Sequence, residues 1–219
     1  PRTVAAITAT VGGSAQRPVV TGAPLASGCH RRPGRYGESM ARTAAPGTRE
    51  RIVAAVLPLF DRHGVRAVGT AQVVAAAGCG KNLLYRHFPG KSDLAAAYLT
   101  AVRERWERAT DRAVAAAGTP RERLLAVVED LAARVRDPAF RGCAMRNHLR
   151  EFEGEDDAAT RVAHGWLACE RDRVAGLAAA AGAPPETARR VRLVLEALYA
   201  AAGRPDAAEQ ADTAVGLAH

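Results

Sequence analysis

The feature that most constrains this chain is the stretch from Thr70 to Lys91, which has the pattern of two short helices joined by a tight turn. Small apolar residues lead to Gly78, and glycine at a helix end readily adopts the left-handed conformation that a sharp turn requires. In the second helix, Leu84 and Phe88 are four residues apart, so they share one face and leave polar side chains on the others. The stretch therefore predicts a helix-turn-helix.

The residues around this motif make it similar to the DNA-binding region of the TetR (tetracycline-repressor-like) family of bacterial regulators. Its aromatic-x-x-Phe ending, with a lysine three residues later and a long following helix, is more specific than a bare helix-turn-helix. The resemblance covers roughly a fifth of the chain well. It is carried by Arg49-Glu-Arg-Ile52, Ala55, Leu59-Phe60, Gly64, Ala77-Gly78, Tyr85-Arg-His-Phe88, Lys91 and Leu94.

The expected fold is all-α, because no stretch of useful length alternates apolar and polar residues as a strand would. The resemblance implies a three-helix DNA-binding head over residues 48–93 and a helical ligand-binding and dimerisation body over residues 94–219. Residues 1–47 are rich in Gly, Pro, Ser, Thr and Arg, which predicts a disordered basic leader. Met40 is the expected native start, and a basic arm that adds DNA affinity is the alternative.

Helical periodicity and capping residues predict the remaining elements. Pro58 is unusual inside the first helix, because proline removes one backbone hydrogen bond. The segment 140–152 resembles a phrase from the centre of TetR-like ligand domains and leads to a helix boundary. The expected helices span 48–63, 91–117, 120–136, 157–181, 185–202 and 206–217.

The polar residues of the motif divide by chemistry into two sets. Aromatic and ammonium tips suit phosphate oxygens, as matching positions of the family commonly do, whereas amides and cations are able to address base edges. Thr70 is the expected N-cap of the first motif helix and belongs to the same surface. The predicted phosphate contacts are Tyr85, His87 and Lys91, and the predicted base contacts are Gln72, Lys81, Asn82 and Arg86.

Two positions depart from the family pattern and motivate a second hypothesis. Gly80 stands where Ser or Thr usually caps the recognition helix, and Leu83 replaces a usual Thr. Leu83 could contact a thymine methyl group, or it could mark a weakened reader. The main expectation is a ligand-responsive repressor that binds a near-palindromic operator as a dimer. The alternative is a TetR-fold interaction or ligand-binding protein whose DNA-reading helix has decayed.

The charge distribution agrees with a DNA-binding first half. The formal net charge is +8, and residues 40–93 carry six Arg and two Lys against two Asp and one Glu. Residues 109–219 instead carry fifteen Arg against seventeen acidic residues. A basic segment that contains a helix-turn-helix, joined to a mildly acidic body, is the electrostatic pattern of a nucleic-acid-binding protein.

By resemblance, the body encloses a pocket for an unknown small-molecule effector. An ordinary core role is the alternative for each candidate. Apolar stripes over 162–177 and over 188–198 are suited either to the protomer core or to an interface with a second copy of the chain. The interface with a second copy is expected. The candidate pocket residues are Trp106, Phe140, Met145, His148, Phe152 and Trp166.

Several classes of protein are not expected. The chain has neither a span long and apolar enough for a membrane nor a convincing signal peptide. The cysteines fit neither a metal site nor a disulfide framework, so we expect a cytoplasmic protein without metal or cofactor. It has no Ser-x-x-Lys, Gly-x-Ser-x-Gly or phosphate-loop motif of an enzyme. Cys143 with His148 is the one nucleophile pair that could be imagined.

Overall fold

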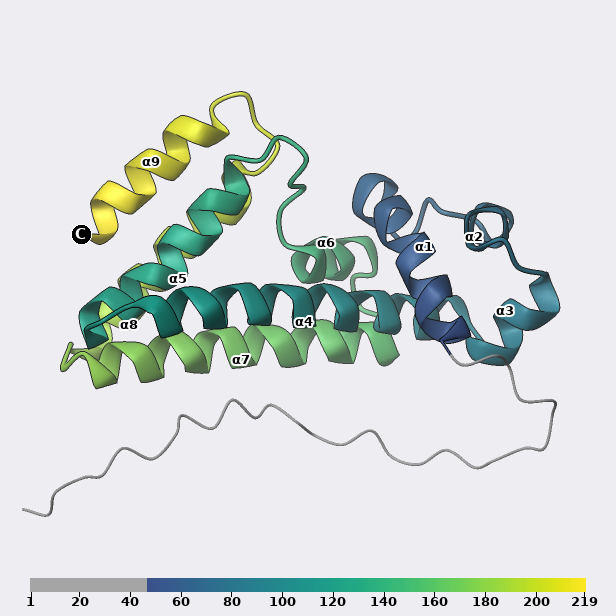
Figure 1. The fold of residues 1–219 in the computed structure, drawn as a ribbon, viewed down its shortest axis with the longest axis horizontal. Coiled ribbons are helices and arrows are strands. Elements are labelled where there is room, and N and C mark those ends of the chain that lie inside the picture. The colour runs from purple at the N-terminus through teal and green to yellow at the C-terminus, as the bar shows by residue number, and fades with distance from the viewer. Residues whose placement is uncertain (1–46) are drawn as a thin grey trace, which may run out of the picture. The chain divides into compact units, whose positions relative to one another are not determined.

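The computed structural model describes residues 47–219, and every regular element in this part of the chain is an α-helix (Figure 1). This confirms the predicted all-α class. The predicted leader up to residue 46, with the proposed start at Met40, lies outside the described residues. The helices are α1 (Thr48–His63), α2 (Thr70–Ala77), α3 (Lys81–His87), α4 (Lys91–Ala116), α5 (Pro120–Val135), α6 (Ala144–Glu151), α7 (Ala158–Ala180), α8 (Pro185–Ala201) and α9 (Ala207–Ala218).

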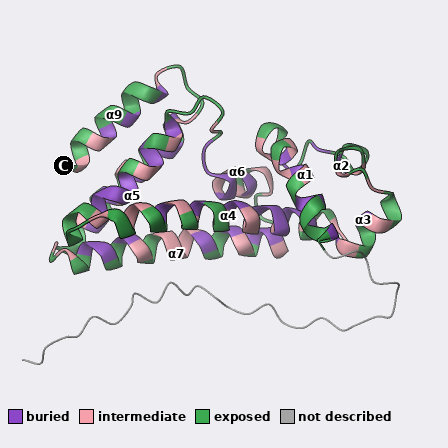
Figure 2. Cartoon of the chain, in the orientation of Figure 1, coloured by how far each residue is buried: buried purple, intermediate pink, exposed green. Residues whose placement is uncertain are grey.

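Helices α1, α2 and α3 pack around a small apolar core together with the start of α4 (Figure 2). Each helix supplies one apolar face, as the spacing of its apolar residues requires. The ring of Phe60 meets Tyr98 edge-on at 5.3 Å between ring centroids. The hydroxyl of Tyr98 donates to Oδ1 of Asp61 at 2.5 Å, which joins α4 to the end of α1. The buried residues of this core include Ile52, Val56, Phe60, Val73, Leu84, Phe88 and Leu94.

Helix α1 continues through Pro58, although proline has no backbone N–H to donate. Pro58 is exposed, so the carbonyl that loses this partner lies on the solvent side of α1. The helix ends where expected, at Gly64, whose N–H donates to the carbonyl of Phe60 at 3.0 Å. Gly64 has φ 78°, a left-handed angle that favours glycine.

Helix α4 is continuous from Lys91 to Ala116, so one helix runs from the helix-turn-helix into the body. It packs along α7 and against α5, and α9 lies beside α5 and α8 (Figure 1). Trp106 of α4 meets Trp166 of α7 at 5.7 Å between ring centroids. The Thr119 hydroxyl caps α5 by accepting from the N–H of Glu122, with Pro120 in the first turn as predicted.

Two expectations need correction. Residues 144–151 form a helix, α6. The sequence analysis assigned no helix to this segment and expected only that it leads to a helix boundary. The α8 stripe is also mostly buried within a single protomer, which means that the prediction of burial by a second copy is wrong for Ala188, Val191, Leu195 and Leu198. Within the protomer, α8 contacts α5, α7 and α9.

The helices of residues 47–219 include none long and apolar enough to cross a membrane. Among the described residues, Cys79 and Cys143 carry free thiols.

Candidate functional site

Helix α3 presents an exposed polar face on a buried apolar anchor. Leu84 is 4% exposed and Phe88, which follows the helix, is 2% exposed, so these two side chains fix α3 on the core of the head. Tyr85 is 49% exposed although its ring is largely apolar. Such a convex face, on a short helix held at a fixed angle, matches the shape of the DNA major groove. The exposed residues on this face are Lys81, Asn82, Tyr85 and Arg86.

The turn between α2 and α3 is set by Gly78. Its φ of 59° and ψ of 35° are left-handed, and the next N–H, that of Cys79, donates to the carbonyl of Val74 at 3.3 Å. Gly80 precedes α3 with an extended backbone, and it provides no side-chain cap. The first N–H groups of α3 therefore remain available to an external acceptor, such as a phosphate oxygen.

The start of α2 differs from the expectation for Thr70. Gly69 occupies the N-cap position, Thr70 is the first helical residue, and no side-chain hydroxyl caps the helix. Instead, Oε1 of Gln72 accepts from the N–H of Gly69 at 2.8 Å. Gln72 is therefore engaged through its carbonyl oxygen, which leaves its amide NH₂ group as the part that can address a base. The two predicted contacts, Thr70 and Gln72, are both exposed.

The remaining predicted contacts are less exposed or already engaged. Nζ of Lys91 donates to the carbonyl of Arg66 at 2.9 Å, and partial burial lowers the pKa of Lys91. An ammonium group has three protons, so this bond leaves donors for a phosphate. Leu83 is half-buried. His87 is half-buried, and its Nε2 is buried with no hydrogen-bond partner among the described residues.

The loop between α1 and α2 is tied to the end of α6 by Arg66, a residue that the sequence analysis did not single out. Its N–H donates to Oε2 of Glu151 at 2.7 Å, and its Nε donates to the Glu151 carbonyl at 2.8 Å. Its guanidinium lies 4.7 Å from the ring centroid of Phe152 and 3.6 Å from Oε1 of Glu155. The orientation of the head is thus coupled to α6.

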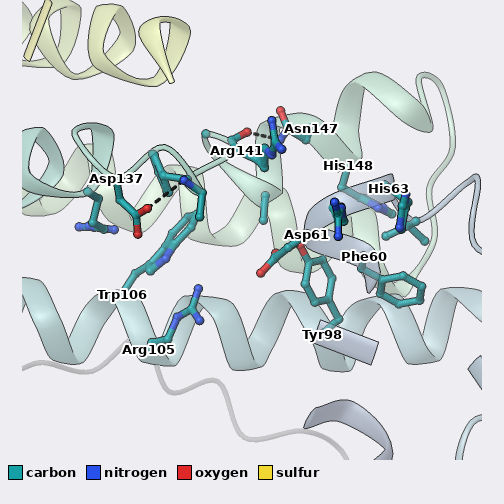
Figure 3. A pocket seen from close by; sticks show the side chains of 18 of the residues that line it. Phe60, Asp61, His63, Tyr98, Arg105, Trp106, Asp137, Arg141, Asn147 and His148 are labelled. Atoms are coloured by element: carbon teal, nitrogen blue, oxygen red, sulfur yellow. Dashed lines mark hydrogen bonds between the residues drawn. The ribbon is translucent and has the colours of Figure 1, made fainter. Parts of the chain in front are cut away.

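A cavity of about 830 Å³ lies beside this junction (Figure 3). It is lined by the end of α1, by α4, by the end of α5 and its connection to α6, and by α6 itself. Three predicted pocket residues line it: Trp106, Phe140 and His148. The other three do not. Met145 is fully buried core, Phe152 stacks on His148 at 4.6 Å, and Trp166 packs on Trp106.

The imagined nucleophile pair is not formed. Neither ring nitrogen of His148 has a hydrogen-bond partner among the described residues, which excludes a bond to the thiol of Cys143. Burial also raises the pKa of Cys143, which disfavours the reactive thiolate. Within residues 47–219, no group of three or more His, Cys, Asp or Glu side chains could hold a metal ion.

Comparisons with known proteins agree with this geometry. Residues 52–98 match the sequence model of the bacterial regulatory proteins of the tetR family. Over 76 residues the chain is 40% identical to the HTH-type transcriptional repressor KstR of Mycolicibacterium smegmatis. That match covers 35% of this chain and 37% of the repressor, so the chain spans little more than a third of that relative's length.

Solved structures extend the similarity into the body. A TetR-family regulator of Streptomyces coelicolor, SCO4454, aligns with a TM-score of 0.71 and 24% identity over 78% of this chain and 92% of its own. The putative regulator sav143 of Streptomyces avermitilis aligns with a TM-score of 0.63 and 29% identity over 78% of this chain and 97% of its own. The helix-turn-helix region is thus similar in sequence to the DNA-binding region of TetR-family regulators, and the described part of the chain resembles solved TetR-family regulators in fold.

Proposed function

We propose that this protein is a DNA-binding transcriptional repressor that binds a near-palindromic operator as a dimer and is released by a small molecule. The observation that carries the proposal is the exposed face of α3, which presents Lys81, Asn82 and Arg86 on a rigid apolar anchor. The name of the similar KstR protein, a transcriptional repressor, supports the direction of regulation. Its site of action is the cytoplasm, where the operator lies.

The proposed contacts follow from side-chain chemistry. Lysine and arginine pair with guanine, and asparagine with adenine, so Lys81, Asn82 and Arg86 read bases. Tyr85 and Lys91, with the uncapped N–H groups at the start of α3, hold phosphate oxygens and set the register of the helix. Gln72 is a secondary base contact because its carbonyl oxygen is engaged at Gly69. Thr70, Leu83 and His87 are further proposed contacts at the edge of the same surface.

We place the head at residues 48–93 and the ligand-binding and dimerisation body at residues 94–219. The continuous helix α4 and the contact of Arg66 with Glu151 are two routes by which the body affects the head. A ligand releases the protein from DNA only if its affinity for the conformation that cannot bind DNA exceeds its affinity for the DNA-binding conformation. For complete release the difference must be several kcal/mol. The cavity between α1 and α6 is suited to this role because both elements line it.

The function is tested by fluorescence anisotropy with DNA from upstream of the protein's own coding sequence, at two salt concentrations and with scrambled competitor DNA. We expect tight binding that resists the competitor and falls as salt rises, because cations on the protein release counterions from DNA. The double variant Lys81→Ala, Asn82→Ala should lose roughly tenfold or more in affinity and lower the salt slope by about one. Arg112→Ala, on an exposed face of α4, is the matched control and should bind as the unaltered protein does.

The alternative is a TetR-fold interaction protein with a decayed reading helix, which is favoured by the missing cap at Gly80 and by the half-buried Leu83. In that case, competitor DNA removes all binding and the Lys81, Asn82 variant changes nothing specific. The same titration therefore separates the two functions.

A further inference from the structure

The cavity beside α6 combines two kinds of wall. One is aromatic: Trp106 and Phe140 meet edge-on at 6.0 Å between ring centroids, and Phe60 with Tyr98 forms a second pair. The other wall is polar and comes from α1, α6 and the connection that precedes α6. A cavity of about 830 Å³ with one aromatic wall and one polar, charged wall has the size of a small-molecule site and suits a ligand that is apolar at one end and polar at the other.

The acidic side chains of this cavity already have partners. Asp61 accepts from the hydroxyl of Tyr98, Glu151 accepts from the N–H of Arg66, and Oδ1 of Asp137 accepts from the N–H of Ala139 at 2.8 Å. Each carboxylate is thus held by the protein itself. The cavity does not depend on a ligand cation to neutralise them.

Three lining arginines, in contrast, have guanidinium groups without a partner among the described residues: Arg62, Arg105 and Arg141. Arg134, the fourth, is paired with Asp130. Figure 3 shows Arg105 extending from α4 toward the space between Trp106 and Asp61. Burial raises the pKa of Tyr98, Asp61 raises it further, and the positive charge of Arg105 opposes the rise. Arg105 therefore acts on this side of α4, toward the cavity.

His148 provides an independent indication that a ligand belongs here. Its side chain is 2% exposed, it lines the cavity, and both of its ring nitrogens lack hydrogen-bond partners among the described residues. A buried polar group without a partner is unfavourable, because it has lost its hydrogen bonds to water, so native proteins usually satisfy it. A polar atom of a bound molecule would supply the missing partner.

We propose that the effector of this protein is an amphipathic carboxylate that binds in this cavity. Its carboxylate pairs with Arg105 from α4 and Arg141 from the connection before α6. Its apolar body contacts Trp106 and Phe140, and a polar atom on it bonds to a ring nitrogen of His148. This assignment rests on the proposed function, because it names the chemical class that the regulator senses.

Calorimetric titration of the full chain at pH 7.5 tests the class with two probe pairs, 2-naphthoate against 2-naphthamide and decanoate against decanamide. Each pair has one apolar body and differs in charge. We expect at least one carboxylate to bind at least tenfold more tightly than its own amide, since hydrogen bonds to charged groups are the stronger ones. Neither carboxylate binding, or an amide binding as tightly as its acid in both pairs, overturns the assignment.

The site is tested by Arg105→Met, which keeps an apolar stem but removes the charge. We expect a roughly tenfold loss of carboxylate affinity with unchanged amide affinity, whereas Arg112→Met, on the same helix outside the cavity, keeps both. Equal loss in both variants, or none in either, overturns the role of Arg105. Anisotropy on the same preparations with upstream DNA keeps the two proposals separate. If the carboxylate binds but operator DNA does not, only the proposed repressor function is contradicted. If operator DNA binds but the carboxylate is not preferred over its amide, only the proposed effector class is contradicted.

Discussion

At the scale of single residues, His148 illustrates how burial sets the pH response of this protein. Burial lowers the pKa of His148, against the opposing charges of Asp157, Glu151 and Glu155. The folded protein therefore binds this proton less readily than the unfolded chain, whose histidine titrates near its ordinary value of about 6.5. The contribution of His148 to folding stability is therefore fully present above that value and is lost as the pH falls below it.

We expect the urea-unfolding free energy of the protein to fall between pH 7.5 and pH 5.5, and to fall less in His148→Gln, which cannot take up the proton. His164→Gln is the control, because His164 is exposed on α7 and should leave the pH dependence unchanged. Tryptophan fluorescence follows unfolding through Trp106 and Trp166, which lie in the body. An identical pH dependence in His148→Gln and the unaltered protein would contradict this account.

Residue positions were predictable from the sequence where a helical face decides them. The exposure of Lys81, Asn82 and Arg86 follows from the apolar spacing of Leu84 and Phe88, which fixes the buried side of α3. Tertiary partners were not predictable in this way. The bond from Lys91 to the Arg66 carbonyl, and the contact of Arg66 with α6, join segments that are distant in sequence and carry no local pattern.

At the scale of elements, the two glycines around α3 allow opposite predictions. Gly78 has a left-handed backbone, which costs an L-residue about 1–2 kcal/mol, so Gly78→Ala should destabilise the protein by about that amount. Gly80 has φ −78°, and a β-carbon there meets nothing within 4 Å. Gly80→Ser should therefore stabilise the protein by about 0.5–1 kcal/mol, through a capping hydroxyl and a less flexible unfolded chain.

Urea unfolding of both variants measures these changes, and operator titration adds a second readout. The new hydroxyl of Gly80→Ser lies where the family usually bonds a phosphate, so its DNA affinity should rise. Gly80→Ala is the matched control, since it removes the same flexibility without adding a hydroxyl. If the alanine and serine variants are equally stable and bind DNA equally, the missing cap has no consequence for this helix.

Element boundaries were predictable wherever capping chemistry marks them. Gly64 ends α1, and Thr119 with Pro120 begins α5, both as expected. Helix α6 was missed because its eight residues span about two turns, too few for a periodic apolar pattern to stand out. The place of the cavity was not predicted either, because the cavity forms where α6 and the connection before it approach α1, and α6 itself was not predicted.

At the scale of the whole molecule, the proposed dimer must be formed by side chains that the protomer leaves exposed. The α8 stripe is largely used inside the protomer, but Leu193, on another face of α8, is 70% exposed. Exposed Ala197 and Ala200 follow it at intervals of four and three residues, which continues one face of the helix. A large apolar side chain beside small ones is suited to close helix packing across a two-fold axis.

We therefore expect Leu193→Asp to weaken dimerisation at least tenfold in analytical ultracentrifugation, because burying a leucine contributes about 1.5–3 kcal/mol and a buried carboxylate opposes association. Leu217→Asp is the control: Leu217 is 75% exposed on a different helix, α9, and its substitution should leave the dimer intact. Operator affinity should fall in parallel for Leu193→Asp alone, since each protomer provides one α3 to one half-site. If the Leu193→Asp protein stays dimeric, the interface does not lie on this face of α8. If the unaltered protein is monomeric at micromolar concentration, the proposed function does not involve a dimer.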